Sequence, residues 1–266
     1  MEIGAIGLNP TTTSNIQSTS EQISSGEQLN SAAQSPAAVQ IVSQLTGQIR
    51  GESAAYRNVI DGVSAVQTAE GGLSNVRDGL QQLRELSIQA NNGTLNQSDR
   101  DSLQNQADEL LNGIRDSIEN TRFNNRSLLN DDSQLELQTG ANSDDQQSVN
   151  SFNLSDAFDN AGLFDIDLAS GELSDTLDSI DQALDITDGA SSEFGSVLSR
   201  LEINAQNLQT SSVNQSASRS QINDTDIAAA STELAKEKLS QDVEIALLSQ
   251  ANANRGQVLQ LLNGVP

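Results

Sequence analysis

Apolar residues recur at alternating spacings of three and four positions through the first third of the chain. Between Val42 and Leu80, nine of the twelve positions at this spacing are apolar, and no proline follows Pro36 in the segment. A seven-residue repeat of this kind packs one helix along another at a shallow crossing angle. It predicts a long helix that ends near Ala90. The predicted packed positions are Val42, Leu45, Ile49, Glu52, Tyr56, Val59, Val63, Val66, Glu70, Leu73, Arg77 and Leu80.

A second helix is expected directly after this one. The run Asn91-Asn92-Gly93 predicts the end of the first helix, because asparagine and glycine tolerate positive φ angles. Ser98, followed three residues later by Asp101, is a capping-box signal for a new helix. Its apolar positions have the same spacing, so it can fold back as a hairpin that ends near Phe123. Those positions are Leu103, Ala107, Leu110, Ile114 and Ser117.

The apolar period changes to two between about residues 123 and 170, which predicts short strands or hairpins. Three of the five phenylalanines, Phe152, Phe158 and Phe164, fall in this region, and we expect them to form a small local core rather than an aromatic binding surface. The alternating positions are Leu135, Leu137, Thr139, Phe152, Leu154, Phe164, Ile166 and Leu168.

The spacing of three and four resumes at Leu173 and predicts a second long helix, antiparallel to the first. The pattern weakens after Leu208 and recovers at Ile222. Its positions are Leu173, Leu177, Ile180, Leu184, Thr187, Ser191, Phe194, Leu198, Leu201, Ala205 and Leu208. The predicted fold class is mainly α: an elongated rod of long antiparallel coiled-coil-like helices with a small β-hairpin region, plus paired terminal helices.

Both chain ends differ from the rod. Residues 1–35 are rich in Ser, Thr, Asn and Gln, and the C-terminal segment predicts a helix with apolar residues on more than one face. One partner cannot cover all of them, so we expect the ends to be poorly ordered in a monomer and to fold on assembly. The apolar residues are Val243, Ile245, Leu247, Leu248, Val258, Leu259, Leu261 and Leu262.

Composition excludes several classes of function. The net charge is −24, and no Lys or Arg occurs between Ser127 and Ser199, so nucleic acids and anionic membranes are not expected partners. With no histidine and no cysteine, the chain lacks the usual acid-base, thiol and zinc chemistry, and we expect neither an enzyme nor a cofactor or metal site. Asp165 and Asp167 begin a calcium-loop spacing, but the later positions do not continue it.

The N-terminus has no basic start and no apolar run of signal-peptide length, and no segment is long enough to span a membrane. These features alone predict a cytoplasmic protein, unless a dedicated export machine reads the chain.

Six segments, in order, resemble bacterial flagellin. "SSGEQLNSA" (24–32) resembles SSG-x-x-(I/L)-NSA, "RNVIDGVSAVQTAEGGL" (57–73) resembles RNANDGISIAQTTEGAL, and "LRELSIQANNGT" (83–94) resembles VRELSVQATNGT. "TRFNNRSLL" (121–129) is similar to TQFNGVKVL, "SRSQINDTDIA" (218–228) to SRIEDADYA with its preceding Ser-Arg, and the "LLSQAN" and "VLQLL" segments to LAQAN and VLSLL.

The resemblance implies a subunit of the flagellar filament with two domains. Residues 1–35 and 225–266 would form D0, the inner tube, and residues 36–224 would form D1, the helical rod; outer D2 and D3 domains are not expected. The implied location is extracellular, after export without a cleaved signal peptide. The implied partners are further copies of the chain, an export chaperone on the C-terminal helix, and the filament cap and hook-associated proteins.

The resemblance also implies particular surface residues. Subunit-packing candidates are Leu83, Arg84, Glu85, Leu86, Ala90, Leu248, Gln250, Ala251, Asn252, Val258, Leu261 and Leu262. Two charged D1 positions that a host innate sensor reads in some flagellins align with Gln82 and Gln106, which predicts weak sensing. The segment before Ser24 is shorter than usual and contains Pro10, and the tail at 263–266 has no assigned role.

Two other functions fit parts of the sequence. A hook-filament junction protein shares the terminal motifs, but it has weaker matches to "RELSIQANNGT" and usually a larger middle region. A secreted coiled-coil adhesin would satisfy the heptads alone. Polymerisation separates the hypotheses, because an adhesin would form monomers or closed oligomers, whereas a filament subunit adds indefinitely.

Overall fold

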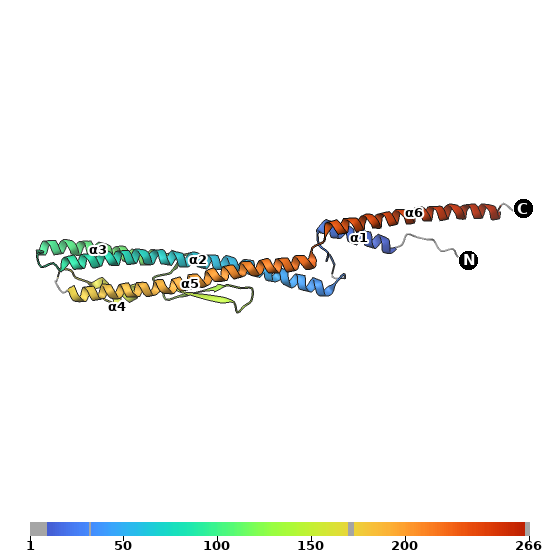
Figure 1. Ribbon diagram of the computed structural model, residues 1–266. Coiled ribbons are helices and arrows are strands. Elements are labelled where there is room, and N and C mark those ends of the chain that lie inside the picture. The colour runs from blue at the N-terminus through green and yellow to red at the C-terminus, as the bar shows by residue number, and fades with distance from the viewer. Residues whose placement is uncertain (1–9, 32, 170–172, 264–266) are drawn as a thin grey trace. The chain divides into compact units, whose positions relative to one another are not determined.

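A computed structural model describes residues 10–31, 33–169 and 173–263 of the chain, and Figure 1 shows its helices and strands. The chain divides into two compact units, one made of residues 1–47 and 214–266 and the other of residues 48–213. The predicted domain boundaries lay between residues 35 and 36 and between residues 224 and 225.

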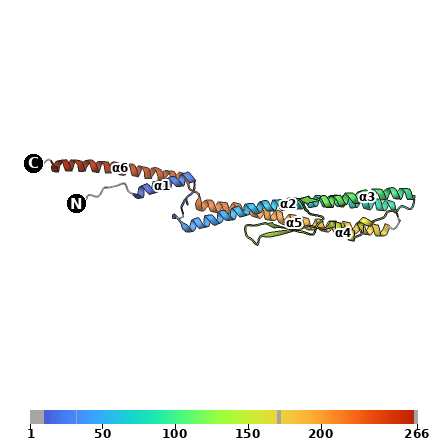
Figure 2. The same ribbon diagram turned by 180° about the vertical axis from the view of Figure 1, so that it is seen from behind.

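Three helices build the larger unit: α2 (Pro36–Ala90), α3 (Gln97–Asn120) and α5 (Leu173–Asn223), of which α2 and α5 continue into the smaller unit. Figures 1 and 2 show α3 and α5 lying beside α2 in both views. Arg77 and Arg84 of α2 pair with Asp188 and Asp181 of α5, so the residue numbers run in opposite directions and the two helices are antiparallel. The predicted long antiparallel helices are confirmed.

The buried face of α2 follows the predicted heptad in one row and departs from it in the other. Every seventh residue from Glu52 through Val59 to Leu80 is buried, as predicted. In the second row, however, the predicted Tyr56 is 38% exposed, while Ala55 beside it is 1% exposed. The second buried row consists of Ala55, Gly62, Ala69, Val76, Leu83 and Ala90.

Helix α5 shows the same shift by one position. Ala183, Ala190 and Val197 are buried where the sequence pointed to Leu184, Ser191 and Leu198, which are only half-buried. The small side chains of Ala183 and Ala190 lie at the centre of the buried face, and the larger Leu184 and Leu198 lie at its edge. A search for regularly spaced apolar residues gives more weight to large side chains than to alanine. The sequence therefore predicted burial for residues that lie at the edge of the packed face.

Helix α3 begins two residues earlier than its predicted capping box. Asn96 is the N-cap: its side chain accepts from Asp99 N, and the Asp99 carboxylate accepts from Asn96 N. This reciprocal pair replaces the predicted Ser98 and Asp101, because asparagine caps as well as serine does. The helix ends at Asn120, close to the predicted Phe123. Its buried residues are Ala107, Leu111, Ile114 and Ile118.

Two antiparallel hairpins follow α3, as the period of two predicted. β1 (Arg122–Phe123) pairs with β2 (Arg126–Ser127) through Asn124 and Asn125, whose φ angles of 48° and 65° suit a two-residue hairpin turn. β3 (Gln134–Gln138) pairs with β4 (Gln146–Asn150), with Leu135 opposite Val149.

The second half of this region is helical, and the strand predictions there were wrong. Leu154 begins α4 (Leu154–Asn160), whose N-cap Asn153 accepts from Asp156 N at 3.2 Å, and Phe164 lies in a short 3₁₀ helix, η1 (Leu163–Asp165). An Asn three residues before an Asp is itself a helix-start signal, and it outweighs a short apolar alternation.

The predicted phenylalanine core is confirmed. Phe158 is fully buried, its ring centroid is 6.3 Å from that of Phe164, and Phe152 meets Phe194 of α5 edge to face at 5.2 Å. Arg115 of α3 stacks over Phe164 at 4.2 Å, a cation–π contact that joins α3 to η1. Phenylalanine therefore binds the short elements to the long helices.

The smaller unit contains the predicted paired terminal helices, α1 (Pro10–Ser25) and α6 (Ile227–Asn263). Pro10 opens α1 at the first helical position, where its missing N–H leaves no hydrogen bond unmade. Thr19 donates to Glu237 at 3.2 Å, and Thr225 N donates to Gly26 O at 2.9 Å, so α1 and α6 run antiparallel. Gly26, at φ +72°, ends α1 in the left-handed conformation that favours glycine.

Candidate assembly surfaces

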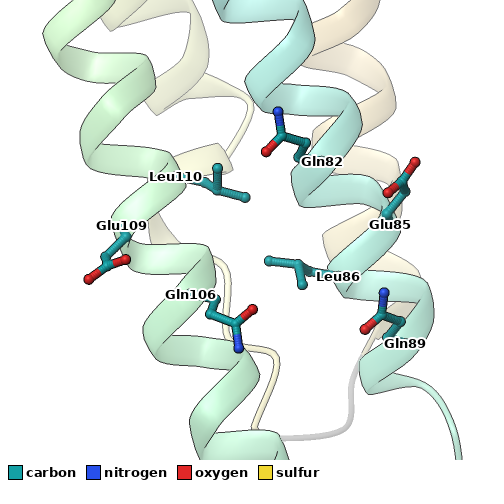
Figure 3. A pocket seen from close by; sticks show the side chains of 7 residues that line it. All are labelled: Gln82, Glu85, Leu86, Gln89, Gln106, Glu109 and Leu110. Atoms are coloured by element: carbon teal, nitrogen blue, oxygen red, sulfur yellow. The ribbon is translucent and has the colours of Figure 1, made fainter.

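A shallow groove lies between α2 and α3, as Figure 3 shows. Leu86 and Leu110 point toward one another across it, and both are half-buried. Gln82 and Gln106 flank these leucines, while the remaining lining residues are Glu85, Gln89 and Glu109. We call this feature the α2–α3 groove; it has an apolar floor and an uncharged or acidic rim.

The predicted packing residues at the end of α2 divide between the interior and the surface. Leu83 and Ala90 are fully buried, so they pack α2 within its own subunit. Leu86 and Glu85 line the α2–α3 groove, where Glu85 is exposed. A neighbouring molecule can therefore reach both of these side chains.

Arg84, predicted as a candidate for pairing between subunits, pairs within the chain. Its Nε donates to Asp181 Oδ1 at 2.8 Å. This hydrogen bond and the negative charge of Asp181 raise the pKa of the Arg84 guanidinium above its ordinary value. Ninety-seven residues separate the two partners, so no local pattern in the sequence could have joined them.

A second ion pair repeats this arrangement one heptad away. Arg77 Nη2 lies 2.6 Å from Asp188 Oδ1, and both the arginines and the aspartates are seven residues apart. All four side chains remain substantially exposed, so the pairs add little to stability. They mark the register of α2 against α5, because a shift by one residue would separate both pairs.

The terminal helices have no apolar core of their own among the described side chains. Every buried apolar residue lies between Ala55 and Leu201, whereas the buried side chains of the smaller unit are the polar Thr19 and Asn223. Half-buried residues of α6 recur at spacings of three and four on the side of Glu237, which contacts α1. They are Leu234, Glu237, Gln241, Glu244 and Leu248. With so few apolar residues in it, this seam provides little hydrophobic stabilisation.

Another face of α6 carries exposed apolar residues. Leu239, Val243 and Leu247 follow one another at intervals of four and are 65%, 50% and 64% exposed. We call these three residues the outer stripe of α6. Ile245 and Val258 are also exposed, so apolar residues cover more than one face, as predicted. A contiguous apolar stripe on an exposed helix marks a surface that meets a partner.

The other predicted C-terminal packing residues are on α6. Leu248 and Ala251 are half-buried, while Gln250, Asn252 and Val258 are exposed. The side chains of Leu261 and Leu262 lie outside the described part of the structure.

The described residues contain no group of three or more acidic, histidine or cysteine side chains that could hold a metal ion. Among the described residues, no helix combines the length and the apolar character that crossing a membrane requires.

A well-packed helical unit, together with a pair of helices whose described side chains bury no apolar residue, is typical of a structural protein. The sequence matches the family models of the bacterial flagellin N-terminal helical region over residues 8–134 and of the C-terminal helical region over residues 177–262. It is 34% identical to a flagellin of Halalkalibacterium halodurans over 92% of this chain and 91% of that protein. It is 31% identical to a flagellin of Bacillus subtilis over 96% of each chain. The chain belongs to the bacterial flagellin family, and it is a subunit of the extracellular flagellar filament.

Solved structures agree with this assignment. The crystal structure of Bacillus cereus flagellin aligns with a TM-score of 0.53 at 27% identity, covering 57% of this chain and 88% of that one. A putative flagellar hook-associated protein from Vibrio parahaemolyticus aligns with a TM-score of 0.59 over 72% of this chain and the whole of that one, but at 13% identity this likeness concerns the fold alone. The junction-protein and adhesin alternatives are not favoured. The family is one of structural, non-enzymatic proteins that polymerise.

Proposed function

We propose that the chain polymerises through its terminal unit, with α1 and α6 forming the inner-tube domain D0 and the unit of α2, α3 and α5 forming D1. The observation that carries this proposal is the contrast between the two units. Buried apolar residues of the described chain belong to the larger unit, while α6 exposes its outer stripe. Contacts with other subunits would bury that stripe, and a heterologous contact of this kind generates an open helical filament.

Electron microscopy of seeded polymerisation tests the proposal. Purified full-length protein, given short filament fragments as seeds, is expected to form long tubular filaments, and the same protein without residues 229–266 is expected to form none. If the full chain stays monomeric or forms closed oligomers with seeds present, the proposal fails.

The same apolar face of α6 suits an export chaperone before assembly. Residues 229–262 include the outer stripe, and a newly made subunit with this surface exposed would aggregate unless a partner covered it. The chain would then leave the cell without a cleaved signal peptide. The filament cap and the hook-associated proteins would contact the subunits at the two ends of the polymer.

We expect this flagellin to stimulate the host innate sensor weakly. The two positions that carry opposite charges in stimulating flagellins are occupied by Gln82 and Gln106, which lie in the α2–α3 groove and are exposed. A neutral amide at each position removes the charge-assisted contacts that a partner would make there.

A cell reporter assay with purified monomer checks this expectation. The double variant Gln82→Arg/Gln106→Glu should raise the response, whereas the matched variant Asn105→Glu, on α3 but outside the groove lining, should not. Full potency of the unmodified monomer would contradict the prediction.

A further inference from the structure

Chemically labile side chains are few in this chain. It has no cysteine or tryptophan and a single methionine, so oxidation has few targets. The remaining reactive sites are asparagines and aspartates followed by glycine, because a residue without a Cβ leaves its backbone nitrogen unhindered for attack on the preceding side-chain carbonyl. The chain has six such pairs: Asp61-Gly62, Asp78-Gly79, Asn92-Gly93, Asn112-Gly113, Asp188-Gly189 and Asn263-Gly264.

The structure separates one of these pairs from the others. Four pairs lie inside α2, α3 or α5, where the glycine N–H is held by the helical hydrogen bond to the carbonyl four residues earlier. The pair at 263 ends α6, and Gly264 is outside the described residues. Asn92 and Gly93 instead form the exposed turn between α2 and α3. Among the hydrogen bonds of the described chain, none is donated by Gly93 N.

The side-chain amide of Asn92 is also polarised for attack. Its Oδ1 accepts two hydrogen bonds from Thr94, one from the backbone N at 3.1 Å and one from the hydroxyl Oγ1 at 2.9 Å. Negative charge develops on this oxygen when a nucleophile adds to Cγ, and donors already directed at it lower the barrier. Asn112 lacks this arrangement, since its Oδ1 accepts from Arg115 Nη1 at 3.4 Å within a helix.

We propose that Asn92 is a site of spontaneous deamidation, promoted by Thr94. Gly93 N loses its proton to solvent and bonds to Asn92 Cγ, the bond from Cγ to Nδ2 breaks, and ammonia leaves. Water then opens the resulting succinimide to aspartate or isoaspartate. Either product adds a negative charge to the α2–α3 turn. Isoaspartate also reroutes the backbone through Cγ and so alters the turn closed by the hydrogen bond from Leu95 N to Asn92 O.

The experiment uses purified full-length protein incubated in alkaline buffer made with oxygen-18 water. No lysine precedes Lys236, so trypsin cuts at Arg84, Arg100 and Arg115 and places Asn92 and Asn112 on separate peptides. We expect the peptide 85–100 to gain the label, localised to residue 92 by fragmentation, at least about tenfold faster than the peptide 101–115. Equal rates at the two sites would overturn the proposal.

Two substitutions test the part played by Thr94. Thr94→Val removes the hydroxyl donor and should slow labelling about fivefold, the rate equivalent of one neutral hydrogen bond. Thr94→Ser retains the hydroxyl and should keep the rate. Gly93→Ala, where a Cβ meets open space, should nearly stop labelling without disturbing the helices, as circular dichroism would verify. A Thr94→Val protein that deamidates at the original rate would refute the role of Thr94.

Discussion

Replacing Val243 and Leu247 with aspartate is expected to abolish filament formation and to leave the monomer's fold unchanged. The two side chains are 50% and 64% exposed in the single chain, so the substitutions remove little packing within it. In a filament they would place two carboxylates in an apolar contact, where each unpaired charge costs several kcal/mol. The penalty recurs at every subunit. Electron microscopy after seeding measures the loss, and circular dichroism measures the helix content of the monomer.

The matched control adds the same charge on another face of the same helix. Ser231→Asp/Ser249→Asp also introduces two carboxylates at exposed positions of α6. At about 100° per residue, Ser231 and Ser249 lie at the same angle, about 120° around the helix from the centre of the outer stripe. This variant should polymerise. If both double variants fail, charge alone accounts for the loss, and if both polymerise, the outer stripe is not a subunit contact.

The adjacent glycines Gly71 and Gly72 in α2 are expected to respond in opposite directions to alanine. A Cβ on Gly72 would lie 2.9 Å from Leu129 Cδ1 and would overlap the Thr121 side chain. Thr121 is β-branched, and its hydroxyl donates a hydrogen bond to Ser117 O at 2.6 Å. The Thr121 side chain therefore cannot move aside easily. We expect Gly72→Ala to lower the free energy of unfolding by about 1–3 kcal/mol. Gly71→Ala should raise it by about 0.5–1 kcal/mol, because that Cβ meets open space and alanine favours the helix.

Urea unfolding of the two variants measures both changes. The midpoints are compared when the unfolding free energy falls with urea concentration at the same slope in both variants. The neighbouring sites share one helix and one substitution, so helix propensity cancels and only the contact with Thr121 and Leu129 distinguishes them. Equal midpoints would mean that α3 and the β1–β2 hairpin pack less closely on α2 than the structure shows.

Local patterns in the sequence were enough for the long elements. The heptad spacing placed α2, and the same spacing placed α5, because a regular apolar stripe over many turns has one explanation, a helix with a partner along its length. The terminal motifs identified the family, and the spread of apolar residues over several faces of α6 was also visible in the sequence.

Which residue of a pattern faces the core depended on tertiary packing. Ala55 and Ala183 are buried and Tyr56 is exposed, because contacts with segments far away in the chain decide which side of an apolar stripe is covered. In the same way, a cap was visible in the sequence near Ser98, but Asn96 and Asp99 form it. Leu154 and Phe164 followed a strand-like alternation, yet the Asn153 cap and packing on the Phe158 core made their segments helical.

The sequence by itself determined the kind of protein and its long helices, since repeat spacing and family motifs are properties of neighbouring residues. Only the tertiary structure decided which side chains remain available. Arg84 pairs with Asp181 because α5 returns antiparallel to α2, and Leu83 and Ala90 are buried within the larger unit. The outer stripe of α6 and the turn at Asn92 stay exposed, because availability depends on contacts between segments far apart in the chain.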